Sequence, residues 1–462
     1  MRSIHRILPL FLLLFLKTVS AQEAQLTKER AIALVLENNF DIEVAKNQVV
    51  IAENNKSILN SGYLPTLAGN AGASYGRDDS TIEFPGQFQV DSTGEPIVDG
   101  DGNTVPRADV EIDKAESQLY NAGLTLNYTL FDGLGRRYNY KTLKEQYQLS
   151  QLQARETIEN TIVQLFSIYF EVARLTENEN VQHQALEISK ERVKRATYAF
   201  EYGQNTKLDI LNAQVDETND SVNLLRTQQE LANAKRDLNV VLNQDLNESF
   251  VVDTVVAFLP TLQIESYVGQ SEANNVSLLQ AEQNVLINAY DIEISKSGYL
   301  PTIGLTGSYG WNLNQSAASA FFPGTNNTTY SLGLGANLSW NLFDGGATNV
   351  RVRNAKIAYK NQEIRQKQIK IEVDRDILNA LDTYETLLEV YKIQEQNVLT
   401  NQNNFDRSRE QYQLGRITSI EFRDAQINLL NAQTNKNLAK YDAKLAELQL
   451  LQLTGQLLNV AF

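Results

Sequence analysis

The chain has no cysteine, only 2 histidines, and 8 prolines among 462 residues. The absence of cysteine excludes disulfides, thiolate nucleophiles, cysteine zinc sites and lipid attachment through cysteine. Two histidines leave little material for imidazole chemistry. The 56 acidic residues outnumber the 41 basic ones, and a net charge of −15 argues against nucleic-acid binding, which needs clustered Lys and Arg. Length alone favours two or three compact domains.

The first 21 residues have the layout of a secretory signal peptide. Arg2 and Arg6 precede an apolar run from Ile7 to Leu16, and Val19-Ser20-Ala21 supplies small residues for cleavage. This run of about ten residues is too short to cross a bilayer as a helix, and no longer run follows. We therefore expect an exported protein that lacks residues 1–21, with an uncleaved anchor as the alternative.

The rest of the chain is an internal duplication. Ser-Gly-Tyr-Leu-Pro-Thr at residues 61–66 returns at 297–302, and Leu-Phe-Asp-Gly at 130–133 returns at 342–345. Because such landmarks recur in the same order, two copies of one structural unit are expected. We assign the signal peptide to 1–21, the first repeat to 22–246, a linker to 247–267 and the second repeat to 268–462.

Long stretches without helix breakers predict long helices. Proline is absent from residues 107–259 and 324–462, and glycine is nearly absent from most of both stretches. We expect one helix from about Gly133 to Phe200 and its counterpart from Gly345 to about Tyr412. Each turns at a single glycine and returns for about forty residues, as two antiparallel hairpins. Coiled-coil spacing supports them in two series, which are Ile158, Ile162, Leu165, Tyr169 and Val172, and Ile357, Ile364, Ile371 and Leu378.

Two segments per repeat alternate between apolar and polar residues, as strands do. Residues 120–130 and 332–342 show this clearly, and their partners run from Pro65 to Tyr75 and from Pro301 to Trp311. The acidic stretch 77–118 reads as a loop. Strands of this length suit a membrane, although a soluble sheet covered by the helices is the alternative. Aromatic residues at the strand ends suggest membrane-interface positions, namely Tyr63, Phe131, Tyr299 and Phe343.

Four strands cannot close around a lumen. In a bilayer every backbone group must be paired, and small membrane barrels need about eight strands. Several chains must therefore share one barrel if the sheet spans a membrane. Two chains would give a filled barrel and three would leave room for a pore.

The ordered combination of these features resembles the TolC family of outer-membrane efflux and secretion channels. The resemblance implies a mainly α fold with membrane β: a homotrimer with long α-helical hairpins forming a periplasmic α-barrel, and four strands per chain in a shared 12-stranded barrel in outer-membrane lipid. Residues 247–267 would lie in its equatorial region. Its partners are a periplasmic adaptor and an inner-membrane pump of the RND or ABC type. Many members carry a lipidated N-terminal cysteine, which this sequence lacks.

The resemblance points to the turn of the second hairpin as the pore entrance. The family carries acids there that ring the pore, and the matching residues are Glu421 and Asp424. Acids three residues apart share one helix face, and threefold symmetry would bring six carboxylates to the axis, favouring cations. Two solvated acids on an exposed face are the alternative.

The family also closes the entrance with a polar latch between a tyrosine and an acid of the other hairpin, which match Tyr412 and Asp209. The family arginine of this latch falls on Ile417, and the adjacent Arg416 is its expected substitute. The turns themselves would contact the adaptor, and they comprise Gly203, Gln204, Asn205, Thr206, Gly415, Arg416, Ile417 and Thr418.

Two other motifs are too incomplete to predict a ligand site. Gly133-Leu134-Gly135 lacks the third glycine of a dinucleotide site, and Thr104 replaces the glycine that the calcium-loop pattern beginning at Asp99 requires. We expect no catalytic residue, cofactor, bound metal or nucleic acid. The sequence predicts the exit duct of a tripartite pump for small molecules. A type I protein secretion component and a soluble exported coiled-coil adaptor are the alternatives.

Overall fold

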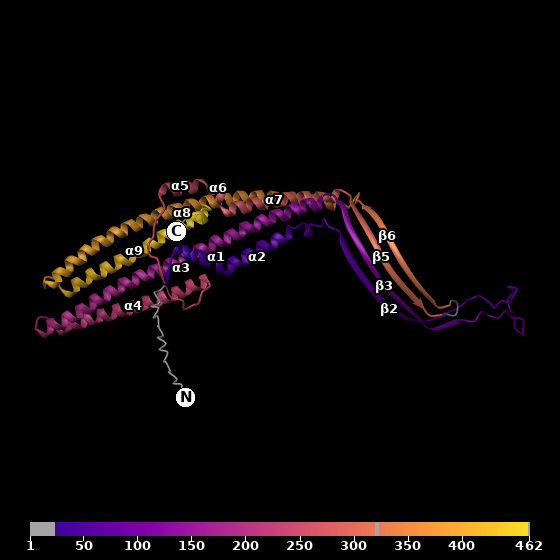
Figure 1. Ribbon diagram of the computed structural model, residues 1–462, viewed down its shortest axis with the longest axis horizontal. Helices are drawn as coiled ribbons and strands as arrows, with labels where there is room; N and C mark the ends of the chain where they lie inside the picture. The colour runs from indigo at the N-terminus through magenta and orange to yellow at the C-terminus, as the bar shows by residue number, and fades with distance from the viewer. Residues whose placement is uncertain (1–23, 319–322, 461–462) are drawn as a thin grey trace, which may run out of the picture. The chain divides into compact units, whose positions relative to one another are not determined.

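The computed structural model describes residues 24–318 and 323–460 (Figure 1). The predicted signal peptide, residues 1–21, lies outside them. The described residues form two compact units. The first unit comprises 24–51, 148–284 and 363–460, and the second comprises 52–147 and 285–362 apart from 319–322. Both sequence repeats contribute to both units.

The first unit is built from helices and two short strands. Its elements are β1 (Ala24–Leu26), α1 (Lys28–Asn38), most of α2 (Phe40–Asn55), α4 (Lys207–Leu242), β4 (Phe250–Val252), α5 (Thr261–Gly269), α6 (Ser271–Asn274), α9 (Ser419–Leu453) and η3 (Leu457–Asn459). Three further helices run through both units, namely α3 (Gly135–Glu201), α7 (Val276–Lys296) and α8 (Ala347–Gln413).

The two long hairpins predicted from the breaker-free stretches are confirmed. α3 and α8 each have 67 residues, or about 100 Å at 1.5 Å per residue. The returning helices α4 and α9 have 36 and 35 residues. None of the helices that the structure describes combines the length and apolar composition needed to cross a membrane.

Within the first unit the long helices form a layer in the order α8, α9, α3, α4 (Figure 1). Hydrogen bonds between neighbouring helices set this order. They join Tyr384 of α8 to Glu447 of α9 (3.1 Å), Lys440 of α9 to Glu177 of α3 (2.7 Å), and Gln228 of α4 to Glu179 of α3 (3.0 Å). Two edge helices, α8 and α4, therefore bound the layer.

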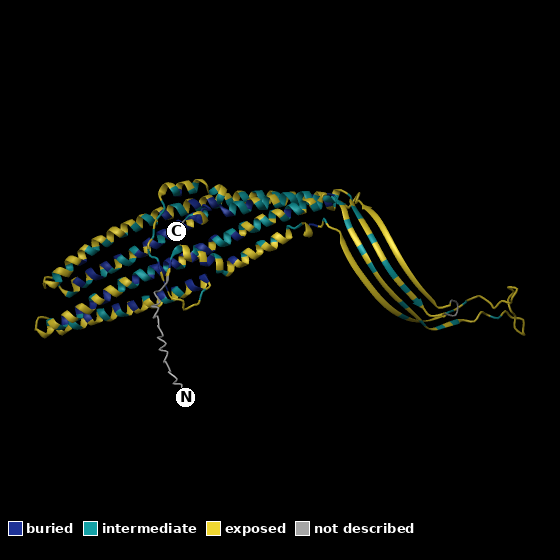
Figure 2. Cartoon of the chain, viewed as in Figure 1, coloured by how far each residue is buried: buried dark blue, intermediate teal, exposed yellow. Residues whose placement is uncertain are grey.

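The core of the first unit follows the predicted coiled-coil series on α3. Leu165, Tyr169 and Val172 are fully buried (Figure 2). The hydroxyl of Tyr169 donates to the Leu26 carbonyl at 2.7 Å and accepts the N–H of Asp253 at 2.9 Å. Burial raises the pKa of Tyr169 to about 12. This hydroxyl ties the parallel strands β1 and β4 to the helical layer.

The segment predicted as a linker, residues 247–267, contains β4 and most of α5. A buried ion pair holds it against α9. Lys444 donates to Glu447 and to the carbonyl of Ala257 at 2.7 Å, and Glu447 accepts the N–H of Leu259 at 3.0 Å. Because buried charges are costly unless every group is paired, this arrangement favours one fixed path for the segment.

The second unit contains one antiparallel sheet in the order β2, β3, β5, β6. Its strands are β2 (Thr66–Ile82), β3 (Val110–Asp132), β5 (Thr302–Ser316) and β6 (Thr325–Ser339), with η1 (Ile58–Asn60) and η2 (Ser297–Tyr299) beside them. In register, Leu126 lies opposite Leu67 and Gly307, and Gly307 lies opposite Leu334. Along the stretch that faces Tyr120 to Tyr128 of β3, one face is mainly apolar, and the other carries mainly Asn, Ser, Thr and Gly.

The strands differ in length from the prediction. β2 and β3 extend into the predicted loop 77–118, where Arg77 pairs with Glu116, and bridges such as Val90 with Pro96 order the rest. Ladder hydrogen bonds use backbone groups, so charged residues can continue a strand. The prediction that the last strand reaches Leu342 was wrong, because β6 ends at Ser339.

Candidate functional site at the helical hairpin tips

Both hairpins turn with the same backbone geometry. Gly203 and Gly415 adopt φ of +73° and +71°, the left-handed region that glycine enters without steric cost. The N–H after each glycine donates to the carbonyl five residues earlier, at 2.7 Å and 2.9 Å. This Schellman arrangement ends a helix sharply. The predicted tip residues 203–206 and 415–418 lie on these turns and are exposed, except for the half-buried Ile417.

The two predicted acids Asp209 and Glu421 occupy the same position in the two repeats. Asp209 accepts the N–H and hydroxyl of Thr206 at 3.0 and 2.8 Å, and Glu421 accepts those of Thr418 at 2.7 and 2.8 Å. These bonds cap the first turns of α4 and α9. The backbone and hydroxyl bonds from Thr418 hold the pKa of Glu421 below its usual range. Each acid therefore has a structural role beside any role in gating.

Asp424 lies three residues beyond Glu421, and both side chains are exposed. Residues three apart on an α-helix share one face. The structure therefore brings the two acids to one solvent-facing surface at the start of α9. A ring of such pairs requires further chains, so the acidic ring stays a prediction.

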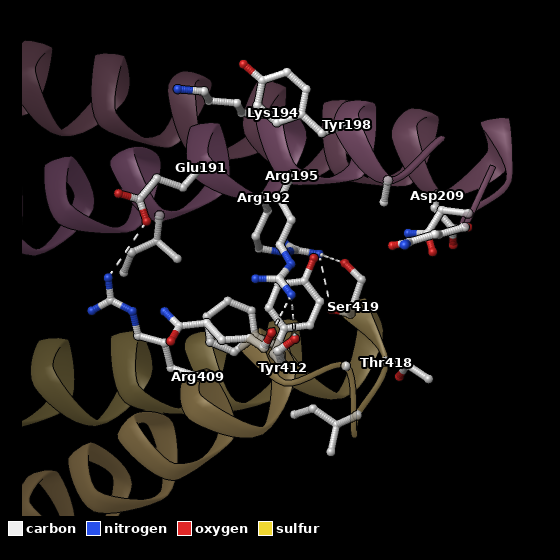
Figure 3. A pocket seen from close by; sticks show the side chains of 18 of the residues that line it. Glu191, Arg192, Lys194, Arg195, Tyr198, Asp209, Arg409, Tyr412, Thr418 and Ser419 are labelled. Atoms are coloured by element: carbon white, nitrogen blue, oxygen red, sulfur yellow. Dashed lines mark hydrogen bonds and ion pairs between the residues drawn. The ribbon is translucent and has the colours of Figure 1, made fainter. Parts of the chain in front are cut away.

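Tyr412 and Asp209 line one groove of about 690 Å³ between the two hairpin tips (Figure 3). The Tyr412 ring stacks on Phe422 at 4.9 Å with an interplanar angle of 8°. The Asp209 carboxylate binds Thr206 instead of Tyr412. Arg416 is exposed on the turn and is not among the residues that line the groove. The structure thus places the tyrosine and the acid in one groove without the predicted link between them.

Sequence reasoning missed two arginines of α3 that reach across this groove. The Arg195 guanidinium lies 4.9 Å from the Tyr412 ring centroid and donates to the carbonyls of Tyr412 and Gln413 at 3.1 and 2.7 Å. Those carbonyls belong to the last turn of α8, which favours a cation. Arg192 binds the hydroxyl of Ser419 at 2.9 Å. Figure 3 shows both side chains pointing from α3 to the second hairpin.

A buried ionic network lies farther from the turns. Arg423 donates to both carboxylate oxygens of Asp220 at 2.7 Å, and Ser189 also donates to Asp220. Asp220 is 1% exposed. Arg192 pairs with Asp216 at 3.0 Å beside this cluster. The network joins α3 and α4 of the first hairpin to α9 of the second. Its sequence signal is an aspartate on the apolar face of α4.

The four predicted interface aromatics all lie in the second unit, near the helix-side ends of the strands. Phe131 is in β3, and Tyr63 precedes β2 by three residues. The Tyr299 hydroxyl donates to Asn349 at 3.0 Å. Phe343, between β6 and α8, is 88% exposed. Contact with lipid stays a prediction for these side chains.

The remaining acidic motif has a local explanation. The Asp99 carboxylate accepts the N–H groups of Asp101 and Asn103 at 3.0 and 2.9 Å, which closes a turn in which Gly102 has positive φ. Among the described residues there is no group of three or more His, Cys, Asp or Glu that could hold a metal ion.

A family model described as outer membrane efflux protein matches residues 31–244 and 267–456. The chain is 23% identical over 447 residues to outer membrane efflux protein BepC of Brucella suis biovar 1 (strain 1330), covering 95% of this chain and 88% of BepC. It is 24% identical over 345 residues to outer membrane protein TolC of Vibrio cholerae, covering 74% of this chain and 78% of that protein.

A solved structure shares the fold. The Campylobacter jejuni CmeC outer membrane channel superposes with a TM-score of 0.71 at 18% identity, covering 93% of this chain and 86% of CmeC. The long helical hairpins and the four-stranded antiparallel sheet are thus those of a known channel fold.

Proposed function

The chain belongs to the outer membrane efflux protein family, and from this premise we propose that three copies form the exit duct of a tripartite efflux pump. It is an outer membrane efflux channel with a helical periplasmic part. It is therefore a conduit and not an enzyme, and the soluble adaptor left open by the sequence does not fit this family. Its partners would be a periplasmic adaptor and an inner-membrane pump that supplies the energy.

The main support for a shared barrel is that both edges of the sheet are open. β2 and β6 are the edge strands, and their outer sides have no strand partner in the part of the chain that the structure describes. Unpaired backbone groups are not tolerated in a bilayer. Pairing β6 of one copy with β2 of the next satisfies them, and three copies give twelve strands. The apolar face would meet lipid, and the uncharged polar face would line the lumen.

The edges of the helical layer support the same assembly. Both edge helices carry exposed apolar residues at seven-residue spacing, which is the pattern of a coiled-coil seam awaiting a partner. A neighbouring copy would cover both seams. They are formed by Leu208, Val215 and Val222 on α4, and by Ile364, Ile371 and Leu378 on α8.

In this assembly the hairpin tips face the inner membrane. The exposed turns 203–206 and 415–418 would receive the adaptor, and Glu421 and Asp424 would line the entrance. Tyr412, Asp209 and the Arg416 substitute would contribute to closing it. The name of BepC supports small-molecule cargo, because this relative, which matches 95% of the chain, is named an efflux protein and not a secretion protein.

Purification from outer-membrane fractions, followed by pull-down of the native complex, tests the proposal. We expect a trimer that dissociates on heating and that co-purifies with an adaptor and a small-molecule pump. A pump dedicated to one secreted protein would instead assign the duct to type I secretion. Recovery as a soluble monomer would reject the channel.

A further inference from the structure

The second unit carries a group of basic residues directly beside its sheet, although the whole chain has a net charge of −15. We call this group the basic collar. It comprises Arg137, Lys141 and Lys144 at the start of α3, and Arg353, Lys356 and Lys360 at the start of α8. Unlike Lys56, Arg136 and Lys296 nearby, none of the six forms an ion pair with a described acidic residue.

Each helix holds its three collar residues on one flank. The spacings of four and three on α3, and of three and four on α8, keep the side chains in line along the helix. Five of the six are exposed. The sixth, Lys141, is half-buried and lies 5.3 Å from the ring centroids of both Tyr138 and Tyr290. The collar is therefore two parallel cationic stripes open to solvent.

The strand backbone identifies the two sides of the unit. The N–H of Ala317 donates to the carbonyl of Glu116 at 2.9 Å, so the residues of β3 in phase with Glu116 direct their backbone groups toward β5. The apolar residues Tyr120 to Tyr128 are in that phase. L-residues couple side-chain direction to backbone direction. Seen from the apolar face with the helices below, the strands therefore run β6, β5, β3, β2 from left to right.

The same order in the helices places the collar on the apolar side. Lys56, directly after α2, lies over the Tyr147 ring of α3, and α7 contacts the other side of α3 through Tyr290 on Tyr138. With these two neighbours fixing its left and right sides, the right-handed turn of α3 places the collar residues on the same side as the apolar face of the sheet. Thr348 of α8 lies beside Gly298 of η2, directly after α7, and this neighbour gives the same side for α8.

We propose that the basic collar binds the phosphate headgroups of anionic phospholipids at the periplasmic surface of the membrane. On the side of the apolar sheet face, the collar comes directly after the strands, with no row of acidic residues between them. At 1.5 Å per residue, all six collar residues lie within about 20 Å of the starts of α3 and α8. The long side chains of Lys and Arg can extend toward the lipid headgroups. The collar cations farther from the sheet attract the headgroups electrostatically over the screening length of about 8–10 Å. The inference rests on the proposed placement of the sheet in the membrane.

A lipid fits better than a soluble anion. The Tyr299 hydroxyl is bound to Asn349, next to the collar flank of α8, which sets an aromatic ring between apolar face and cations. Tyrosine and cationic side chains together are typical of membrane interfaces. The chain also has no cysteine for an acyl anchor. Headgroup contacts would therefore strengthen the anchoring that the strands provide in the membrane.

The test titrates the purified full-length channel in neutral detergent with phosphatidylglycerol or phosphatidylcholine and counts bound lipid by native mass spectrometry. We expect preferential binding of phosphatidylglycerol that weakens with salt. Near an anionic surface each cation contributes about fivefold in affinity. The variant Arg137→Gln, Lys144→Gln, Arg353→Gln and Lys356→Gln should therefore lose at least tenfold in affinity for phosphatidylglycerol and none for phosphatidylcholine.

A matched variant neutralises four other exposed cations of the first unit, Lys194→Gln, Lys207→Gln, Arg226→Gln and Arg407→Gln, and should keep the preference. Equal binding of the two lipids, or unchanged binding by the collar variant, would overturn the inference. So would displacement of phosphatidylglycerol by equimolar glycerol phosphate, or selective binding of purified peptidoglycan. These results leave the channel intact as a heat-sensitive trimer, whereas a soluble monomer rejects the proposed function itself.

Discussion

The two hairpin tips share a backbone design and differ in what surrounds it. Both turn through a glycine at positive φ, and both begin the returning helix with a threonine capped by an acid three residues later. Phe200 and Tyr412 stand at equivalent positions, 212 residues apart. Phe200 is 42% exposed, whereas Tyr412 stacks on Phe422. The duplicated backbone has thus acquired two different side-chain environments.

The difference extends to the contacts between the hairpins. Arg192 and Arg195 of the first hairpin bind the second, and their equivalents in the second repeat are Asn404 and Arg407. At the turns, these two contacts run from the first hairpin to the second, whereas Arg409 and Arg423 of the second hairpin bind acids of the first farther from the turns. A gate that opens by moving the second hairpin must break these contacts. Three experiments follow from this asymmetry.

Asp220→Ala should have the largest effect, because it leaves Arg423 buried without its bidentate partner. Losing one member of a buried pair costs about 3–5 kcal/mol, and we expect about 3 because Asp216 remains 3.7 Å from Arg423. Hydrogen exchange should show faster opening of α4 and α9 beside this pair, with the distant core of α3 unchanged.

The matched control exchanges both residues for those of the opposite repeat, where Ala432 and Leu211 occupy the equivalent positions. Asp220→Ala with Arg423→Leu leaves no unpaired charge, so it should destabilise less than Asp220→Ala alone. A double variant as unstable as the sum of both single variants would show that the ionic pairing is not the source of the effect.

Arg195→Ala should have an intermediate effect on gating. It removes two hydrogen bonds to the last turn of α8, worth about 1 kcal/mol at an exposed site, so the open probability in planar bilayers should rise about fivefold. Arg407→Ala, the equivalent change in the second repeat, should leave it unchanged. Equal effects of the two variants would show that the Arg195 contact does not control the gate.

Thr418→Ala should have the smallest effect, visible only as pH is lowered. The Thr418 bonds keep the pKa of Glu421 low, so the charged cap is fully present above the ordinary glutamate range and is lost as pH falls through the lowered pKa. The variant keeps the backbone N–H bond to Glu421 and loses only the hydroxyl bond, so block of conductance by a trivalent cation should be lost at a slightly higher pH. Identical pH profiles would mean that Thr418 does not influence this carboxylate.

Much of the fold could be predicted because its signals are local. The missing prolines mark the long helices, and period-two alternation marks the strands from Tyr120 to Tyr128. The strand ends were missed because backbone pairing continues through charged residues such as Arg77 and Glu116. Length alone favours two or three domains, and the described residues form two compact units, but length does not reveal that helices such as α3 run through both.

The site was predictable only where one helix supplies it. Helix periodicity placed Glu421 and Asp424 on one exposed face, but the contact of Arg195 with Tyr412 joins residues more than 200 apart, which no pattern along one helix reveals. Asp220, a charge on the buried face of α4 between Ala213 and Leu224, was the available signal.

Block by La³⁺ in planar bilayers tests most directly whether the second hairpin forms the pore entrance. Glutamine can replace glutamate in a capping box, so Glu421→Gln with Asp424→Asn removes both charges and keeps the cap. We expect block to weaken at least tenfold, while Asp209→Asn, at the position equivalent to Glu421 in the first hairpin, leaves it unchanged. Unaltered block in the double variant, or an equal loss in Asp209→Asn, would contradict this assignment.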